Sequence, residues 1–342
     1  MKLNLFAPLN TTSYGYHSSY TYHYLSKMGW DVRHLPIGQN NPDEKFSFGK
    51  EKFHYDAPCL KIWHQFDLSG FTGSPKIGFT VFELEDLNEN EVWNMKYPDK
   101  LIVASKWAQK VCENHGINAS VVPLGYDHEI FYPTPQEEKD HTIFGNFGKW
   151  EIRKGHDVLI RAFNAAFEKD DNVTLVMMPS NPFLSETQRS AWEKMYLNSK
   201  LGSKVQIVPR LPNHKDVAHV MNQIHCGVFP ARAEGWNLEP LELLACGKHL
   251  IISDCTGHKE YANSNNSMMI DMPDKFESAY DGVFFNGASK WRSLGKDQFD
   301  QLVNYMREFH KNRSYIINSN GVKDSKEFTW ENSIDKLSKK IV

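Results

Sequence analysis

Two glutamates, Glu234 and Glu242, stand eight positions apart in the segment ARAEGWNLEPLELLACGKHLIISD, Ala231 to Asp254. Their proximity first suggests a general acid/base pair, but the residues between them favour a different arrangement. Proline suits the start of a helix, where its missing N–H is not needed, so we expect Pro240 to be the first helical residue. Glu234 would then lie in the preceding loop and Glu242 in the first helical turn.

This placement predicts different roles for the two carboxylates. A helix N-terminus offers unpaired N–H groups and positive potential to phosphates, and Glu242 beside it could accept hydrogen bonds from vicinal hydroxyls such as a ribose diol. Glu234 would reach hydroxyls attached beyond the phosphates. The alternative is that both glutamates are helix-start residues favoured by the helix dipole, and for Glu242 alone that is the commoner case.

A second segment, TIFGNFGKWEIRKGHDVLIRAFNAAF, has an apolar strand, a glycine-bearing cationic loop and then an amphipathic helix. Glycines let backbone approach a ligand closely, and cations beside a helix start suit a diphosphate. The loop matches neither a Walker motif nor the Gly-x-Gly-x-x-Gly fingerprint. Alone, it is equally well explained as a solvated charged loop. Its chemistry-bearing residues are Gly145, Gly148, Lys149, Arg153, Lys154 and Gly155.

The elements that must position these residues follow a βαβ rhythm, in which short apolar runs alternate with stretches long enough for a helix. This rhythm predicts parallel sheets, and its two series predict two doubly wound domains. The expected strands are 2–7, 31–37, 60–66, 76–82, 100–105 and 120–125, then 142–148, 173–179, 204–210, 226–231, 249–254 and 267–271.

The two series are separated by residues 131–142, where two prolines and a charge cluster interrupt both patterns. We therefore predict an N-terminal domain of residues 1–136 and a C-terminal domain of residues 137–322. Residues 323–342 are expected to form a closing helix that packs back on the N-terminal domain. Its apolar face would carry Phe328, Trp330, Ile334, Leu337 and Ile341.

Composition excludes several classes of protein. Hydrophobic residues make up 40% and charged residues 24% of the 342 residues, and no segment approaches the run of about 18 apolar residues of a membrane helix. The net charge of −3 disfavours, at the level of the whole chain, a nucleic-acid partner. Five cysteines without a Cys-x-x-Cys pair indicate no disulfide framework. We expect a cytoplasmic protein, with a peripheral membrane association left open.

Taken together, the two segments resemble the retaining glycosyltransferases of family 4. That family has a Gly-Arg or Gly-Lys followed five residues later by Lys-Gly, and then a Glu-x7-Glu motif; the counterparts here are GKWEIRKG and EGWNLEPLELLACG. Further similarities, VVPLGYDHEIFYP, SKWAQKVCENHGI and FTWENSIDKL, extend the resemblance over nearly the whole chain. It implies the α/β GT-B fold, with two Rossmann-like doubly wound domains facing a central cleft, the first binding the acceptor and the second a nucleotide-sugar donor.

The resemblance also implies roles for single residues. Lys149 and Lys154 would neutralise the donor diphosphate, Glu242 would hold the nucleotide ribose, and Glu234 would contact the transferred sugar. We take Glu234, Lys149 and Lys154 as the catalytic residues. The remaining donor-binding positions would be Gly235, Trp236, Asn237, Leu238, Gly148 and Gly15.

Two departures from the family pattern bear on the donor site. Lysine stands at position 149 where arginine is usual, and an ammonium lacks the bidentate grip of a guanidinium. GWN replaces the common GFG, so Asn237 is expected to add a side-chain contact to the sugar pocket.

The first domain keeps one glycine, Gly15, of the family's glycine-rich loop and has Tyr16 where a second glycine is common. The family often has a histidine near the sugar; here strand order offers Glu83 or Thr80, and His64 ends an earlier strand. Glu83, His64 and Tyr16 are therefore our candidates for an acceptor or sugar pocket. Tyrosines crowd the same region, although at helical spacing they are more often packing residues.

The chain contains no Asp-x-Asp triplet, so we expect no metal and no cofactor. The resemblance implies transfer of a hexose with retention, by front-face attack without a protein base, from a nucleotide sugar, by default a UDP-sugar. The expected acceptor is a saccharide or glycoconjugate. Alternatives are a transferase for hydroxymethylated pyrimidines in phage-type DNA, a weakly active nucleotide-sugar-binding module, and a sugar phosphorylase.

Overall fold

The computed structural model describes residues 1–38, 41, 43, 46, 52–135, 140–312 and 317–342. They form two compact units: unit 1 comprises Met1–Asp127 with Glu327–Val342, and unit 2 comprises His128–Lys326. The boundary expected between residues 136 and 137 falls outside the described residues.

The centre of unit 1 is a parallel six-stranded sheet in the order β2-β1-β3-β4-β5-β6. Strand β2 lies on one side of β1 and strands β3 to β6 lie on the other, so the order reverses between β1 and β3. In such sheets, ligands bind outside the carboxyl ends of the strands at the point of reversal. The strands are β1 Lys2–Ala7, β2 Asp31–Pro36, β3 Cys59–Ile62, β4 Lys76–Thr80, β5 Lys100–Val103 and β6 Ala119–Val121.

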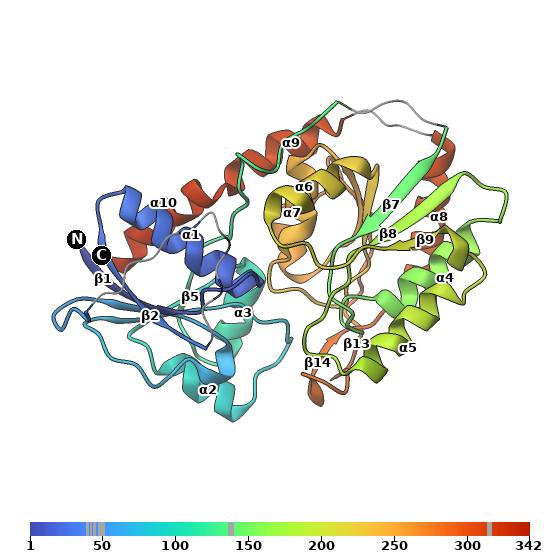
Figure 1. Cartoon of the computed structure of the whole chain (residues 1–342). Helices are drawn as coiled ribbons and strands as arrows, with labels where there is room; N and C mark the ends of the chain where they lie inside the picture. The colour runs from blue at the N-terminus through green and yellow to red at the C-terminus, as the bar shows by residue number, and fades with distance from the viewer. Residues whose placement is uncertain (39–40, 42, 44–45, 47–51, 136–139, 313–316) are drawn as a thin grey trace. The chain divides into compact units, whose positions relative to one another are not determined.

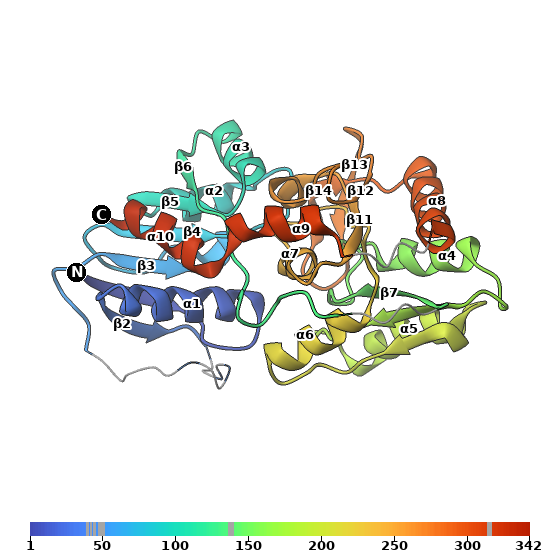
Figure 2. The ribbon, with the colours of Figure 1, turned by 90° about the horizontal axis from the view of Figure 1, so that it is seen from above.

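The C-terminal helix of the chain belongs to unit 1. This helix, α10 Trp330–Ile341, lies alongside α1 Ser13–Lys27, as the red and blue ribbons of Figures 1 and 2 show. The indole of Trp330 stacks on the Tyr20 ring with centroids 5.0 Å apart, and the Ser333 hydroxyl donates to the Pro123 carbonyl at 2.5 Å. The other helices are α2 Glu89–Lys96 and α3 Lys106–Asn114, with the short η1 Gln65–Asp67.

Unit 2 is built on a second parallel sheet in the order β12-β11-β10-β7-β8-β9. Here the order reverses between β7 and β10, which pair directly through Phe144 with Cys226 and Gly145 with Gly227. The strands are β7 Thr142–Asn146, β8 Val173–Met177, β9 Val205–Ile207, β10 Cys226–Phe229, β11 His249–Ser253 and β12 Met268–Ile270.

The core of unit 2 lies between this sheet and its helices. Phe144 and Val228 from the sheet pack with Leu159 of α4 and Leu302 of α8, two helices that lie side by side in Figure 2. The helices are α4 His156–Ala166, α5 Glu186–Leu197, α6 His214–Gln223, α7 Leu238–Ala245, α8 Lys296–Asn312 and α9 Ser319–Ser325, with η2 Gly202–Lys204 and η3 Thr256–Glu260; η4 Lys326–Phe328 leads into α10.

The twelve expected strands all form, and the prediction of two Rossmann-like doubly wound domains is confirmed. Buried parallel strands have nearly continuous apolar runs, which makes them legible in a sequence. The antiparallel hairpin of β13 Phe276–Tyr280 and β14 Asn286–Arg292 was not predicted, because its residues mix charged, aromatic and glycine positions without a clear period. Within the described residues, no helix is both long and apolar enough to cross a membrane.

Candidate functional site

Two loops meet where the strand order of unit 2 reverses. Residues 147–155 follow the carboxyl end of β7, and residues 230–237 follow the carboxyl end of its neighbour β10. Parallel strands bring their carboxyl ends to one edge of the sheet, so the cationic loop and the first glutamate come together there.

These loops share an alternating row of charges. The Lys149 ammonium pairs with Glu151 at 3.0 Å, and Glu151 pairs with Arg153 at 2.6 Å. Glu234 accepts from Arg153 and from Lys154, each at 2.7 Å. All of these side chains are buried except that of Lys149, which is 40% exposed. We call this row the charge cluster.

The two carboxylates of the charge cluster are strongly held in their ionised form. Burial alone would raise the pKa of Glu234, but Arg153 and Lys154 outweigh it and lower this pKa to about 2. Burial also opposes ionisation of Glu151, whose pKa its cationic neighbours, Arg153 first, lower to about 2. Groups with such pKa values do not exchange protons near neutral pH, so Glu234 is unsuited to act as a general acid or base there.

Acid should therefore destabilise the protein in two overlapping stages. Burial lowers the pKa of His156 and of His258 from 6.5 to about 4, so the unfolded chain binds more protons between these values and stability falls as the pH drops below 6.5. The contribution of Glu234 and Glu151 is complete above pH 4.5 and is lost as the pH falls towards 2. Urea unfolding at steps from pH 7 to pH 3 measures this; a free energy of unfolding that stayed level would contradict it.

Lys154 is oriented by a second row of hydrogen bonds. The carbonyl of Ser253 can only accept, so Nδ1–H of neutral His258 donates to it at 3.1 Å. Nε2 of His258 then accepts from Asn237 Nδ2 at 3.0 Å, which turns Asn237 Oδ1 towards Lys154 Nζ at 3.4 Å. The Asn237 side chain therefore links His258 to the Lys154 ammonium.

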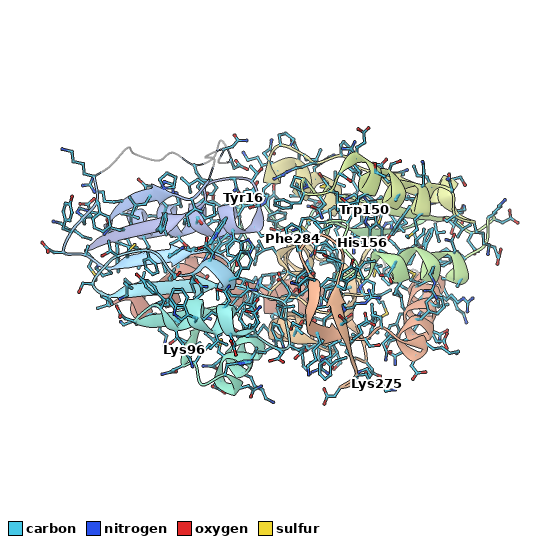
Figure 3. The ribbon with its side chains drawn as sticks, turned by 90° about the horizontal axis from the view of Figure 1, so that it is seen from below. Tyr16, Lys96, Trp150, His156, Lys275 and Phe284 are labelled. Carbon is cyan, nitrogen blue, oxygen red and sulfur yellow. The ribbon has the colours of Figure 1, made fainter. Side chains whose placement is uncertain are left out.

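The backbone of the cationic loop is held by hydrogen bonds from His156, the first residue of α4. His156 Nε2–H donates to the carbonyls of Gly148 and Lys149 at 3.0 and 2.8 Å. The Trp150 ring lies edge-on to the imidazole with centroids 4.9 Å apart, and Figure 3 labels the two residues close together. These contacts fix the backbone that carries Lys149.

Two glycines of this loop have steric roles. A Cβ on Gly148 would lie 2.7 Å from Cδ of Lys154, so the glycine makes room for the lysine stem. Gly155 has a φ of 74°, and a Cβ there would lie 1.9 Å from the carbonyl oxygen of Pro230. Gly155 thereby lets the two loops approach, which the pairing of Lys154 with Glu234 requires.

The start of α7 differs from the prediction. The helix begins at Leu238, so Pro240 is its third residue, a position whose N–H also lacks an intrahelical partner. Glu239 is the acidic residue of the first turn, and Glu242, the fifth residue, lies one turn later and is 4% exposed. The helix-dipole alternative thus fits Glu239 better than Glu242.

The residues before α7 form a tight turn. Asn237 has a φ of 75°. Asparagine tolerates a positive φ better than most residues, so it can occupy this position in place of a glycine. Its side chain does not cap α7. The Tyr261 hydroxyl lies 3.1 and 2.9 Å from the carbonyls of Trp236 and Asn237, and a Cβ on Gly257 would meet the Gly235 carbonyl at 2.5 Å. The backbone N–H groups at the start of α7 are thus held in a fixed frame.

The first-domain candidates lie in unit 1, near the carboxyl ends of its strands. His64 follows β3 and its ring lies 4.6 Å from that of Tyr14, whose hydroxyl donates to the Val81 carbonyl at 2.7 Å, two residues before Glu83. His64 and the Glu83 segment therefore meet around Tyr14.

The other two first-domain candidates have packing roles in α1. A Cβ on Gly15 would lie 2.0 Å from the Asn10 carbonyl oxygen, so this glycine lets α1 pack on the loop after β1. Tyr16 is buried and its hydroxyl donates to Asp43 at 3.1 Å.

Sequence reasoning missed three residues that connect the site, namely Glu151, Arg153 as a partner of Glu234, and His258. Glu151 had a usable signal in the sequence, because a lone glutamate within a cationic loop is expected to pair with the cations beside it. Arg153 is one of those cations. His258 had none, since it lies 21 positions beyond Asn237 and its approach depends on the fold. Within the described residues, no group of three or more His, Cys, Asp and Glu side chains could hold a metal ion.

Comparison with protein families bears on the segment that contains this charge cluster. Residues 127–279 match the family model of glycosyl transferases group 1. The matched segment includes Lys149, Lys154, Glu234 and Glu242, so the resemblance in the two motifs and the glycosyl transferases group 1 match concern the same unit.

Two curated relatives are glycosyltransferases. An uncharacterized glycosyltransferase of Methanocaldococcus jannaschii is 23% identical and matches 70% of this chain and 62% of its own length. The GDP-mannose:cellobiosyl-diphosphopolyprenol alpha-mannosyltransferase of Xanthomonas oryzae is 27% identical over 40% of this chain and 35% of its own length. The chain thus spans less than two thirds of either relative.

Solved structures match the whole chain. Sucrose-phosphate synthase from Thermosynechococcus elongatus has a TM-score of 0.75 and 15% identity, covering 99% of this chain and 98% of that one. Anabaena HepE in complex with UDP-glucose has a TM-score of 0.70 and 12% identity, with the same coverage. The fold is therefore GT-B, as expected from the resemblance, and the family match and the relatives support a glycosyltransferase.

Proposed function

We propose that this protein is a metal-independent, retaining hexosyltransferase of family 4 that uses a nucleotide-sugar donor. The observation that carries the proposal is the buried part of the charge cluster, Lys154, Glu234 and Arg153, at the strand reversal of unit 2 and beside the start of α7. A helix N-terminus with adjacent cations is suited to a diphosphate. The glycosyl transferases group 1 match over these residues supports the same function.

In this proposal the donor extends past the charge cluster. Lys149 and Lys154, with the N–H groups at the start of α7, would stabilise the negative charge that develops on the leaving diphosphate, an effect worth a few kcal/mol per donor group (about 3–4). Glu242 would accept from the ribose hydroxyls and Glu234 would face the transferred sugar.

The transfer step needs no protein base. The acceptor hydroxyl oxygen would form a bond to the anomeric carbon on the face from which the phosphate leaves, the bond from that carbon to the phosphate oxygen would break, and the phosphate oxygen would take the acceptor proton. The pKa of about 2 for Glu234 agrees with a role in binding and not in proton transfer.

We propose UDP as the nucleotide and a saccharide or glycoconjugate as the acceptor. UDP is supported by the Anabaena HepE complex with UDP-glucose, whereas the Xanthomonas relative is named for GDP-mannose. Donor choice is therefore the first experimental question.

A donor panel tests the function directly. UDP-, GDP- and ADP-sugars are added to the full chain, and the melting temperature is recorded. At a hundred times its Kd, a donor that binds only the folded state adds about 2.7 kcal/mol, or about 5 °C or more. We expect the largest shift with a UDP-sugar.

The binding donor is then incubated with and without saccharide acceptors, the product is detected by mass spectrometry, and the anomeric configuration of its new linkage is determined by NMR. Transfer of a hexose with retained anomeric configuration is the expected result. A donor that binds but is neither transferred to an acceptor nor slowly hydrolysed would indicate a binding module instead. The absence of a shift with every donor would overturn the proposal.

A further inference from the structure

The β13–β14 hairpin presents aromatic side chains to the charge cluster. Its turn is held by Asp281, whose Oδ1 accepts from the backbone N–H groups of Val283 and Phe284 at 2.8 Å and of Phe285 at 2.9 Å. These bonds fix the backbone that carries Phe284, which Figure 3 labels. The tip of the hairpin is thus a defined structure.

Lys149 lies against two phenylalanine rings. Its ammonium is 5.6 Å from the ring centre of Phe183, on the loop after β8, and 5.7 Å from that of Phe284. The two rings meet edge to face with centroids 5.0 Å apart, although they are 55% and 50% exposed. Ring faces attract cations, so these half-exposed rings help to hold the Lys149 ammonium, in addition to its ion pair with Glu151.

The hairpin is anchored to the loops of the charge cluster. Glu277 at its base pairs with Arg232, two residues before Glu234, and accepts from the indole of buried Trp291 at 3.1 Å. Near its tip, the Phe285 ring lies 6.0 Å from the Arg153 guanidinium. A shift of the hairpin would therefore change its contacts with both loops, residues 147–155 and residues 230–237.

Lys149 needs contacts that fix the position of its ammonium. A lysine ammonium is a point charge on a flexible stem, without the planar fork that gives arginine a preferred direction. At position 149 the side chain is 40% exposed, and Glu151 is its ion-pair partner at 3.0 Å. The match to the family model ends at residue 279, within β13, so Phe284 lies beyond it.

We propose that Phe284, assisted by Phe183, is a positioning residue that directs the Lys149 ammonium towards the diphosphate of the donor. This inference rests on the proposed function and extends it by making the β13–β14 hairpin a part of the donor site. Phe284 acts through Lys149.

The test uses one change that removes the aromatic ring and one that keeps it. Phe284→Leu preserves an apolar side chain, and Phe284→Tyr preserves the ring face. Phe284→Leu is expected to raise the donor KM about fivefold, whereas Phe284→Tyr stays near the parent value. Tyr280→Leu, on the same hairpin and 62% exposed, is the matched control and should change nothing. Equal effects of leucine and tyrosine at 284 would overturn the inference.

A double-mutant cycle shows whether the effect passes through Lys149. In a Lys149→Met background, Phe284→Leu should cause no additional loss, because the cation that the ring holds is absent. An additional fivefold loss in that background would show that Phe284 acts by another route.

A measurement without any donor separates this inference from the proposed function. Acetic anhydride is applied to the free protein, and acetylation of Lys149 relative to exposed Lys194 is followed by mass spectrometry. Phe284→Leu should increase the relative rate for Lys149, and Phe284→Tyr should not. If this holds but no nucleotide sugar binds, the proposed function fails and the contact stands. If donors bind and the rate is unchanged, the contact fails alone.

Discussion

Replacing Lys154 by methionine is expected to reduce glycosyl transfer by about 100- to 1000-fold, the usual cost of removing one preorganised donor from developing negative charge. The buried ammonium contacts Glu234 at 2.7 Å and Asn237 at 3.4 Å, so its position is already set before a donor binds. Nearly all of the loss should be in kcat, because a group that meets developing charge acts mainly in the transition state.

Folding must be measured beside activity for this variant. Lys154→Met leaves Glu234 with Arg153 as a partner, so we expect a stability loss of up to about 3 kcal/mol, less than that for a fully unpaired buried charge. Lys194→Met removes one exposed lysine from the same unit and should alter neither property. A Lys154→Met enzyme with near-normal turnover would remove Lys154 from the catalytic site.

Replacing Glu242 by alanine should lower kcat/KM for the donor by a hundredfold or more, about 2.7 kcal/mol. Glu242 lies buried one turn into α7, and in this proposal its carboxylate accepts hydrogen bonds from two vicinal hydroxyls of the ribose. Glu242→Gln should be intermediate, because the amide keeps one acceptor and loses the charge. The measurement is initial rate against donor concentration for each variant.

The control for Glu242 is a glutamate that the helix dipole does favour. Glu186 lies in the first turn of α5 and is exposed, and Glu186→Ala should leave donor kinetics unchanged. If Glu242→Ala loses stability but keeps its kcat/KM for the donor, Glu242 is a structural residue and its assignment to the ribose is wrong.

Much of the fold could be predicted from the sequence because its strands are short, buried and apolar, as in the run that became β11. The C-terminal helix was equally legible, since Trp330, Ile334, Leu337 and Ile341 recur at helical spacing and are all buried. The hairpin was not, because β13 and β14 lack a continuous apolar run and are anchored by tertiary contacts such as that of Glu277 with Arg232.

The candidate site divides in the same way. Sequence alone predicted two loops at the ends of parallel strands that carry cations and carboxylates, because the βαβ pattern brings the carboxyl ends of these strands to one edge of a sheet, whereas the adjacency of β7 and β10 came from the structure. Only the tertiary structure decided the partners: Lys154 meets Glu234 across 80 positions, and the Asn237 side chain faces Lys154 and His258. Ion pairs and hydrogen bonds require distances of a few ångströms between segments that lie far apart in the sequence. These distances depend on close packing at glycines such as Gly155, and a local sequence pattern does not predict them.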